Sequence, residues 1–500
     1  NQITIGTKEE LLTFAQNCTL DSWSQGKTVV LTGDIDLTGT DFTPIPTFGG
    51  HFDGQGHAIT GIALDGSGSN RGLFRYLQKS AVVEDLKVEI SITPTDFQDS
   101  LGGLVGNNRR LIRNCTITGN LKGESSVGGI VGINEAGGQV INCTFNGTVV
   151  ATHYVGGIVG QNLGSILQCV NQGGINTVEI ESSTDLDDLP DRQWNSTENV
   201  PTSTDIGGIT GYSSGIVQSC RNIGAVGYAH IGYNVGGIAG RSSGQIRSCT
   251  NQGAVCGRKD VGGIAGQMEP YVRTEVSSGQ FARLQSQLSE LNTLVEKAVS
   301  DAEYGSSEIS DRLSLIAGYL SDASDATKDV RVDVDTDAIT PPSIDANGNI
   351  TFGPNVNVSD VVTVTNFNMV VGSITAAGSQ LSLISENVKT TSTALSSDLR
   401  SINSKFTELS NTMFSAIASV GGSSGSIITD ASSIDVNSVT LGKVSGSKNT
   451  AAVYGDVNTG GIAGSMAIEY TLDPEDDVTG SLSGSYRTQY QYKSIIQQCV

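Results

Sequence analysis

A glycine-rich segment recurs at a nearly constant spacing and constrains the fold more than any other feature of the chain. Each copy begins with two glycines, an aliphatic residue, a variable residue and a third glycine, as in GGIVG. The glycine pairs begin at Gly102, Gly128, Gly156, Gly207, Gly236 and Gly262, so that all intervals are nearly equal except the third, which is almost twice as long. A period of about 26 residues indicates a solenoid of stacked supersecondary units.

The residues between the glycine pairs indicate which solenoid this is. Each repeat contains short runs of Val, Ile and Thr separated by Gly and Asn, without a helical pattern. This predicts one β-helix coil per repeat, with parallel strands stacked about 4.8 Å apart. We expect the glycine pair to take positive φ at a corner and to let neighbouring coils approach closely. Asn171, Asn222 and Asn251 suit a second corner, because Asn tolerates the left-handed region.

Six of the eight cysteines occupy the same position of the repeat, which predicts an internal ladder of stacked side chains. Its members are Cys115, Cys143, Cys169, Cys220, Cys249 and Cys499, with Ser438 predicted at the equivalent position of one later coil. Cysteine is among the most buried residue types, so buried free thiols are the simplest interpretation. Disulfides would need Cβ atoms closer than the coil spacing, and the spacing matches no zinc motif. No cofactor is expected.

Two segments interrupt the early part of the pattern. Residues 7–18 (TKEELLTFAQNC) predict a short amphipathic helix, with Leu11, Leu12 and Phe14 apolar, that caps the open end of the solenoid. The long interval between Cys169 and Cys220 holds an extra stretch about as long as one repeat, which predicts an acidic loop. Its candidate binding residues are Asp185, Asp187, Asp188 and Trp194. They could bind Ca²⁺, but their spacing matches no EF-hand, and a solvated loop is the simpler interpretation.

A helical insert follows the solenoid repeats. Apolar residues at coiled-coil spacing occur in two runs, from Phe281 to Val330 and from Phe367 to Val420. They predict an antiparallel coiled-coil hairpin in which residue i lies level with residue 701 − i, and helices of about 50 residues give an arm about 75 Å long.

Between these runs, residues 331–366 predict a small β tip with a type I′ turn at Asn347-Gly348. The candidate binding residues of the tip are Asp333, Asp335, Asp337, Asn347 and Phe352. Alternatively the tip only closes the hairpin and its aspartates are solvated.

The sequence therefore predicts a mainly β chain with three parts. A β-helix with its cap spans 1–277, the coiled-coil arm spans 278–425, and the β-helix resumes at 426–500. Because the last residues repeat the cysteine segment, we expect the chain to stop in mid-repeat and to belong to a longer protein with further domains.

The repeat resembles that of a known family. The pattern GG-[ILV]-x-G with a downstream Cys-x-Asn-x-Gly, and the lead-in GTKEELLTFAQNC to VVEDLKV, are similar to the GLUG-repeat family of bacterial secreted and cell-surface proteins. The resemblance covers about 1–277 and 434–500. It implies a right-handed parallel β-helix outside the cell, as in adhesin-like proteins and the non-catalytic region of streptococcal immunoglobulin A peptidases. No HExxH zinc motif is present, so the peptidase activity is not implied.

Charge and composition narrow the function. A net charge of −22 argues against binding nucleic acid or anionic membranes, and no apolar run is long enough for a transmembrane helix. Paired carboxylates for glycoside cleavage are few: Asp34, Asp36, Asp53 beside His51 and His57, and the group at 473–477. We expect a non-enzymatic extracellular bacterial protein, adhesin-like, whose arm binds a host surface protein or glycan. The alternative is a carbohydrate-active β-helix enzyme, a polysaccharide lyase or glycoside hydrolase, or its carbohydrate-binding module.

Overall fold

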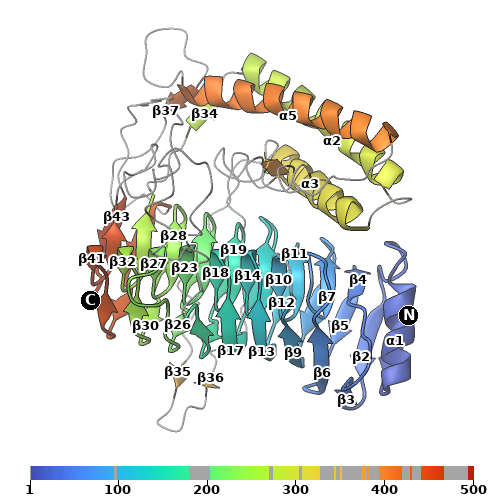
Figure 1. Ribbon diagram of the computed structural model, residues 1–500, viewed down its shortest axis with the longest axis horizontal. Helices are drawn as coiled ribbons and strands as arrows, with labels where there is room; N and C mark the ends of the chain where they lie inside the picture. The colour runs from blue at the N-terminus through green and yellow to red at the C-terminus, as the bar shows by residue number, and fades with distance from the viewer. Residues whose placement is uncertain are drawn as a thin grey trace, which may run out of the picture.

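The computed structural model describes most of the solenoid and part of the insert. The described residues are 2–94, 98–178, 203–269, 274–276, 278–302, 307–326, 343–344, 350–351, 374, 377–378, 381, 384, 393–418, 428–430, 441–466 and 494–500. Within them the chain forms a parallel β-solenoid with helices at one end and along one side (Figure 1).

Each complete coil contributes one strand to each of four parallel sheets, which we number in the order in which the chain visits them. Sheet 1 contains β10 (Asp99–Gly102), β14 (Ser125–Gly128), β18 (His153–Gly156), β23 (Thr204–Gly207), β27 (Tyr233–Gly236), β32 (Lys259–Gly262) and β41 (Val457–Gly460). Sheet 2 contains β4 (Ile45–Phe48), β7 (Phe74–Leu77), β11 (Val105–Asn108), β15 (Val131–Asn134), β19 (Val159–Asn162), β24 (Thr210–Ser213), β28 (Ala239–Ser242), β33 (Ala265–Met268) and β42 (Ala463–Ser465).

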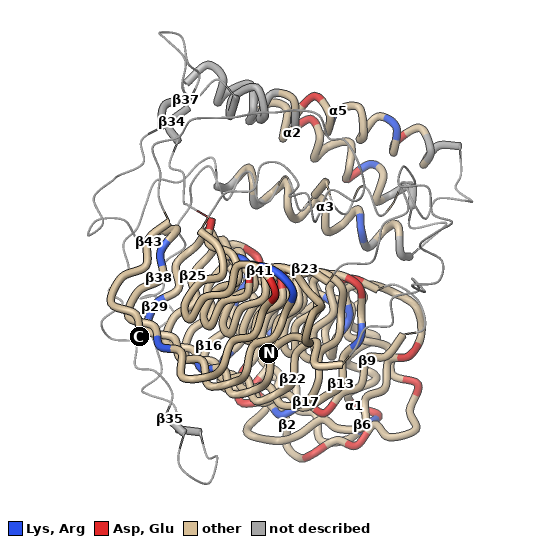
Figure 2. The backbone as a smooth tube through the Cα atoms, turned by 60° about the vertical axis from the view of Figure 1, so that its left-hand side comes forward, with Lys and Arg blue, Asp and Glu red and all other residues tan. Residues whose placement is uncertain are grey.

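The other two sheets complete the coil. Sheet 3 contains β1 (Gln2–Ile5), β2 (Thr28–Leu31), β5 (His51–Asp53), β8 (Val82–Glu84), β12 (Leu111–Arg113), β16 (Gln139–Ile141), β20 (Ser165–Leu167), β25 (Ile216–Gln218), β29 (Gln245–Arg247), β38 (Lys443–Ser445) and β43 (Ile495–Gln497). Sheet 4 contains β3 (Ile35–Asp36), β6 (Ala58–Leu64), β9 (Lys87–Ile92), β13 (Thr116–Lys122), β17 (Thr144–Val150), β21 (Val170–Asn171), β22 (Gly174–Ile175), β26 (Arg221–Asn222), β30 (Thr250–Asn251) and β39 (Lys448–Asn449), and β31 (Val255–Cys256) pairs with β40 (Val453–Tyr454) beside it. Charged residues are sparse along these stacked strands (Figure 2).

The glycine pairs allow close contact between coils, as expected, but the predicted positive φ is wrong. Gly102 and Gly128 pair in register in sheet 1, and neither has positive φ. A Cβ on Gly128 would lie 2.1 Å from the carbonyl oxygen of Val131 and 2.6 Å from the backbone nitrogen of Gly160. Positive φ occurs instead two residues before the glycine pair, as at Ser126, and one residue before the cysteine, as at Asn142.

The asparagines after the cysteine also have a different role from the one predicted. Asn171, Asn222 and Asn251 lack positive φ and are fully buried. Their amides stack: Nδ2 of Asn171 donates to Oδ1 of Asn222 at 2.8 Å, and Asn222 donates to Asn251 at 2.8 Å. Each amide also donates to the backbone carbonyl two residues later at 2.9 Å. The repeat therefore keeps Asn because its amide satisfies buried polar groups along the stack.

The cysteines form one column inside the solenoid, two residues after each sheet 3 strand. Cys115, Cys143, Cys169, Cys220 and Cys249 are buried and unbridged. Each Sγ lies 3.2 to 3.4 Å from the carbonyl oxygen two residues earlier. Burial raises the pKa of the Cys115, Cys169 and Cys249 thiols, which keeps them protonated and unreactive.

The prediction that Ser438 occupies this column in the coil after the insert is wrong. Ser438 lies outside the described residues, and Ser447 occupies the column instead. Arg247 pairs with Ser445, so the residue level with Cys249 is Ser447, whose Oγ accepts from the Cys249 N–H at 3.1 Å. Ser447 Oγ donates to the carbonyl of Ser445, as each thiol does two residues back.

Thiol reactivity provides a test of the cysteine column. We expect a thiol reagent to modify only the half-buried Cys256 and Cys499 in the native protein, and all eight cysteines after unfolding without reductant. Replacing both Cys256 and Cys499 with serine should abolish the native reaction. Fewer than eight thiols in the unfolded chain would reveal disulfides and contradict this structure.

Helix α1 (Lys8–Asn17) covers the N-terminal end of the solenoid, as predicted. Phe14 packs against Trp23, Phe48 and Phe52, with ring centroids 5.9 to 6.0 Å apart. The helix begins with a capping box, because Thr7 Oγ1 accepts from the Glu10 N–H and Glu10 accepts from the Thr7 N–H.

Loss of this cap should affect stability by a moderate amount. Thr7→Ala is expected to cost about 1 kcal/mol in the free energy of unfolding, measured by urea denaturation. Thr7→Ser keeps the acceptor oxygen and should cost less than half as much. Equal losses in the two variants would contradict a capping role.

The insert begins and ends at one short antiparallel ladder. Between β33 and β38, β34 (Thr274–Val276) pairs with β37 (Ile428–Asp430). Helices α2 (Ser278–Ala302) and α5 (Thr393–Ala418) run antiparallel: Gln287 bonds Glu408, and Lys297 bonds Asp398. In both pairs the residue numbers sum to 695, whereas the predicted sum was 701.

The predicted single long arm differs from the structure in a second respect. The first apolar run is divided into α2 and α3 (Ser307–Ala326), and α2 packs against both α3 and α5. Figures 1 and 2 show α3 between the α2–α5 pair and the solenoid. The insert is therefore a folded-back helical layer within the described residues, with a shared apolar core that also contacts Ile133 and Leu163 of the solenoid.

Only the ends of the predicted tip hairpin are described. Strands β35 (Ser343–Ile344) and β36 (Ile350–Thr351) are antiparallel. Their register centres on Asn347, because Ile344 pairs with Ile350. A two-residue Asn347-Gly348 turn would need a register shifted by one residue, so that detail of the prediction is wrong.

Candidate functional site

Several predicted binding residues lie outside the described residues. These are the loop residues Asp185, Asp187, Asp188 and Trp194, the tip residues Asp333, Asp335, Asp337, Asn347 and Phe352, and the acidic group at 473–477. Their roles remain predictions.

The candidate carboxylates near the N-terminus stabilise turns. Asp34 accepts from the Ala58 N–H at 2.9 Å, and His57 Nδ1 lies 3.2 Å from the same oxygen. Asp36 accepts from the Thr38 N–H at 2.8 Å. The Ala58 hydrogen bond, and then the His57 contact, lower the pKa of Asp34, and hydrogen bonds from Thr38 lower the pKa of Asp36. A catalytic acid needs the opposite shift, so neither carboxyl suits that role.

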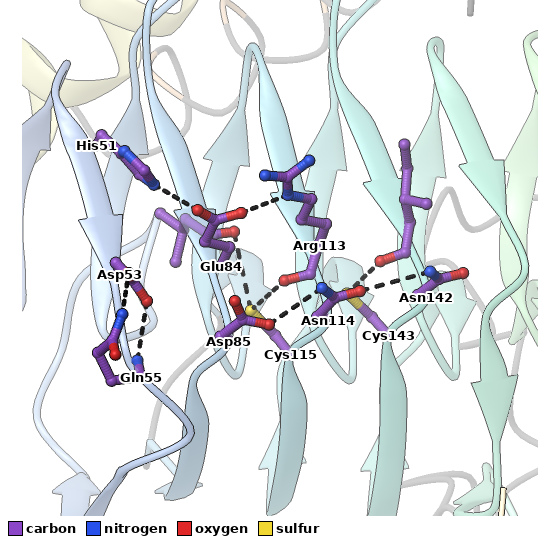
Figure 3. Close-up of polar contacts among 12 residues, drawn as sticks. His51, Asp53, Gln55, Glu84, Asp85, Arg113, Asn114, Cys115, Asn142 and Cys143 are labelled. Atoms are coloured by element: carbon purple, nitrogen blue, oxygen red, sulfur yellow. Dashed lines mark hydrogen bonds and ion pairs between the residues drawn. The ribbon is translucent and has the colours of Figure 1, made fainter. Parts of the chain in front are cut away.

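Asp53 and His51 also have structural partners (Figure 3). Asp53 accepts from the Gln55 backbone at 2.9 Å. His51 Nε2 lies 2.5 Å from Oε1 of Glu84, and Arg113 Nε bonds the other oxygen of Glu84. These three side chains come from β5, β8 and β12, so the cluster connects three successive coils on the outer face of sheet 3. Both Glu84 oxygens hold side chains of neighbouring coils, so this carboxylate has a structural role.

A second charged cluster lies on the outer side of sheet 2. Arg241 contacts Asp205 at 3.0 Å and Glu269 at 2.9 Å, and its guanidinium lies 4.8 Å from the Tyr212 ring centroid. Burial opposes its charge, but the two carboxylates raise the pKa of Arg241 above its usual value. The cluster connects coils at β24, β28 and the end of β33, and it resembles a structural ion-pair network.

The contact between α3 and the solenoid contains the least exposed ion pair of those described above. Arg312 contacts Oδ2 of Asp99 and Oγ of Ser69, both at 3.2 Å, and the Arg312 and Asp99 side chains are 3% and 5% exposed. Arg109 Nη2 donates to the Gly318 carbonyl at 3.0 Å. These contacts could not be predicted from the sequence, because the residues that form them are more than 200 positions apart in the chain.

An open groove lies between α2 and α5, on the part of the insert farthest from the solenoid. Its volume is about 930 Å³. The groove is lined by Glu290, Thr293, Leu294, Ser397, Arg400, Ser401, Ser404 and Lys405. Lys405 Nζ contacts Glu290 at 2.6 Å and Glu408 at 2.9 Å. Hydroxyl groups and cations line the groove together, so it can bind a polar ligand by hydrogen bonds.

The described residues contain no group of three or more His, Cys, Asp or Glu side chains arranged to hold a metal ion. In the same part of the chain, no helix combines the length and the apolar character needed to cross a membrane.

Comparison with known proteins yields one family and one relative. The family described as the GLUG motif matches residues 123–150, which contain β14, β15, β16 and β17, one complete coil. Halomucin of Haloquadratum walsbyi (strain DSM 16790 / HBSQ001) is 33% identical over 122 residues. That match covers 21% of this chain and 1% of Halomucin, and no solved structure matches. The chain therefore contains a GLUG motif at residues 123–150, and the same glycine and cysteine pattern recurs in the adjoining coils.

Proposed function

We propose that this chain is a non-enzymatic, extracellular scaffold of a bacterial surface or secreted protein. It acts as an adhesin-like, right-handed β-helix that presents its insert to a host surface protein or glycan. This proposal is supported by the different roles of polar side chains in the solenoid and in the insert. The candidate carboxylates stabilise turns and coil contacts, whereas the open polar groove lies on the outermost helices. The matched family and the matched protein bear no enzyme name.

The groove between α2 and α5 is the first proposed contact surface. Its hydroxyl side chains suit the hydroxyl groups of a glycan, and Arg400 adds a cation for a carboxylate group, whereas Lys405 is already paired with Glu290 and Glu408. The β tip at 331–366 and the acidic loop, with Ca²⁺ as its candidate ligand, are the other proposed contacts.

A binding screen with matched variants tests this proposal. Wild-type protein is expected to bind acidic glycans or mucin on an array, and Arg400→Ser should weaken binding at least tenfold. The control Lys122→Ser removes an exposed cation from sheet 4 and should leave binding unchanged. A separate deletion of 331–366 tests the tip. If neither change alters binding, both proposed surfaces are wrong.

The enzymatic alternative needs a parallel assay. The same glycans and plant polysaccharides are incubated with the protein, and released reducing ends or unsaturated products are measured. We expect no product. Product release that disappears in Asp34→Asn or Asp53→Asn would overturn the scaffold proposal.

A further inference from the structure

An apolar cluster on the outer face of sheet 3 is buried although it points away from the solenoid core. In each three-residue strand of this sheet, the middle residue faces the core, as Ile112 and Val140 do. The first and third residues therefore face outward. The outward cluster consists of Leu111, Ile141, Leu167 and Ile216, which are 2%, 2%, 1% and 8% exposed, with Val82 at its border.

The neighbouring sheet shows what an uncovered outer face looks like in this molecule. In β13 of sheet 4, the outward residues Thr116, Thr118, Asn120 and Lys122 are all exposed. On sheet 3, even the polar outward residues Gln139 and Gln218 are only 5% and 1% exposed. The outer face of sheet 3 from β16 to β25, together with Leu111 of β12, is therefore a covered interface.

The path of α3 leads toward this face. Arg312 of α3 contacts Asp99, the first residue of β10 in sheet 1. Six residues later, the Gly318 carbonyl accepts from Arg109, which lies at the corner between β11 of sheet 2 and β12 of sheet 3. The helix thus crosses sheet 2 from its sheet 1 side to its sheet 3 side. It ends at Ala326, about 12 Å farther along its axis.

We propose that the outer face of sheet 3 is the docking surface for this chain's own segment 327–373. The segment starts where α3 ends, and its sequence has the character of a covering strand. Val330, Val332 and Val334 alternate with the charged residues Asp329, Arg331 and Asp333. Such alternation gives one apolar face for the sheet and one charged face for solvent.

The two other long excursions of the chain fit this surface less well. Segment 467–493 leaves from β42 in the last complete coil, and its return strand β43 is five strands from β16, about 24 Å. It also carries the acidic group at 473–477. Segment 179–202 connects sheet 4 to sheet 1, so sheet 4 separates it from sheet 3.

Site-specific photo-crosslinking in the full chain tests the proposal. Benzoylphenylalanine replaces Leu167, in the centre of the cluster, and in a control it replaces the exposed Asn120 of sheet 4. We expect Leu167 crosslinks within the same molecule to peptides of 327–373, and none of these from position 120. Crosslinks to 179–202, to 467–493 or to a second molecule would overturn the proposal.

A second measurement avoids the bulky probe. Leu167→Asp places a charge in the interface, so protease cleavage within 327–373 should become at least tenfold faster while the β-sheet circular dichroism signal is retained. Asn120→Asp serves as the matched control and should change nothing. Equal cleavage rates in the two variants would reject the docking. The segment includes the tip at 331–366 that the proposed function assigns to ligand contact, but neither measurement involves a ligand, so docking and ligand binding are tested separately.

Discussion

Replacing Gly128 with alanine is expected to destabilise the solenoid by at least about 3 kcal/mol, the upper range for overpacking. The added Cβ would lie 2.1 Å from the Val131 carbonyl oxygen and 2.6 Å from the Gly160 nitrogen. Both atoms belong to the backbone, so a side-chain rotation cannot relieve the contact. The strands of two coils would have to separate, which weakens the parallel ladders on both sides of β14.

A glycine in the same coil provides the control for this prediction. A Cβ on Gly137 would have its nearest neighbour, the Arg109 carbonyl oxygen, at 3.4 Å, an ordinary contact distance. Gly137 lacks positive φ, so Gly137→Ala should change stability by no more than about 0.5 kcal/mol. The urea midpoint, followed by circular dichroism, measures both variants. Equal losses in the two variants would contradict close contact between coils as the reason for the glycine pair.

The general fold could be predicted from the sequence because its signals are periodic and local. A repeat of nearly constant length with short β runs specifies the solenoid, and the apolar spacing identified the buried residues of the insert, such as Leu291, Leu313 and Leu409. The geometric role of small residues was harder to predict. A glycine pair is compatible with either positive φ or close packing, and only the stacked coils show that packing applies.

Features that depend on long-range register could not be predicted. Ser447 was missed because the coil after the insert lacks its cysteine, which removes the marker that aligns the other copies. The break between α2 and α3 was missed because docking of α3 depends on Asp99 and Arg109, far away in the chain. The same applies to the cluster of His51, Glu84 and Arg113, whose members meet only when three coils are stacked.

The second large effect is expected from Arg312→Ala, which should release α3 from the solenoid. Removing one partner of a buried ion pair typically costs about 3 to 5 kcal/mol, because the other charge stays buried without a partner. Asp99 is 4% exposed, so without Arg312 its carboxylate would be a buried charge without a charged partner. Hydrogen exchange of residues 307–326 measures the release. The control Lys297→Ala breaks a pair whose lysine is 59% exposed, and should cost no more than about 1 kcal/mol.

The pH dependence and a double variant distinguish a charge effect from lost packing. Burial raises the pKa of Asp99, and the Arg312 charge opposes that shift. Without Arg312 the pKa rises further, so the docked state binds a proton more readily than the released state does. Low pH therefore favours docking, and the loss of docking free energy in Arg312→Ala should shrink as the pH falls from 8 to 5.

The double variant Asp99→Asn with Arg312→Met has no buried charge at this contact, so it should dock at every pH within about 1 kcal/mol of wild type. A loss in Arg312→Ala that is the same at both pH values, and that persists in the double variant, would mean that side-chain packing and not charge holds α3 on the solenoid.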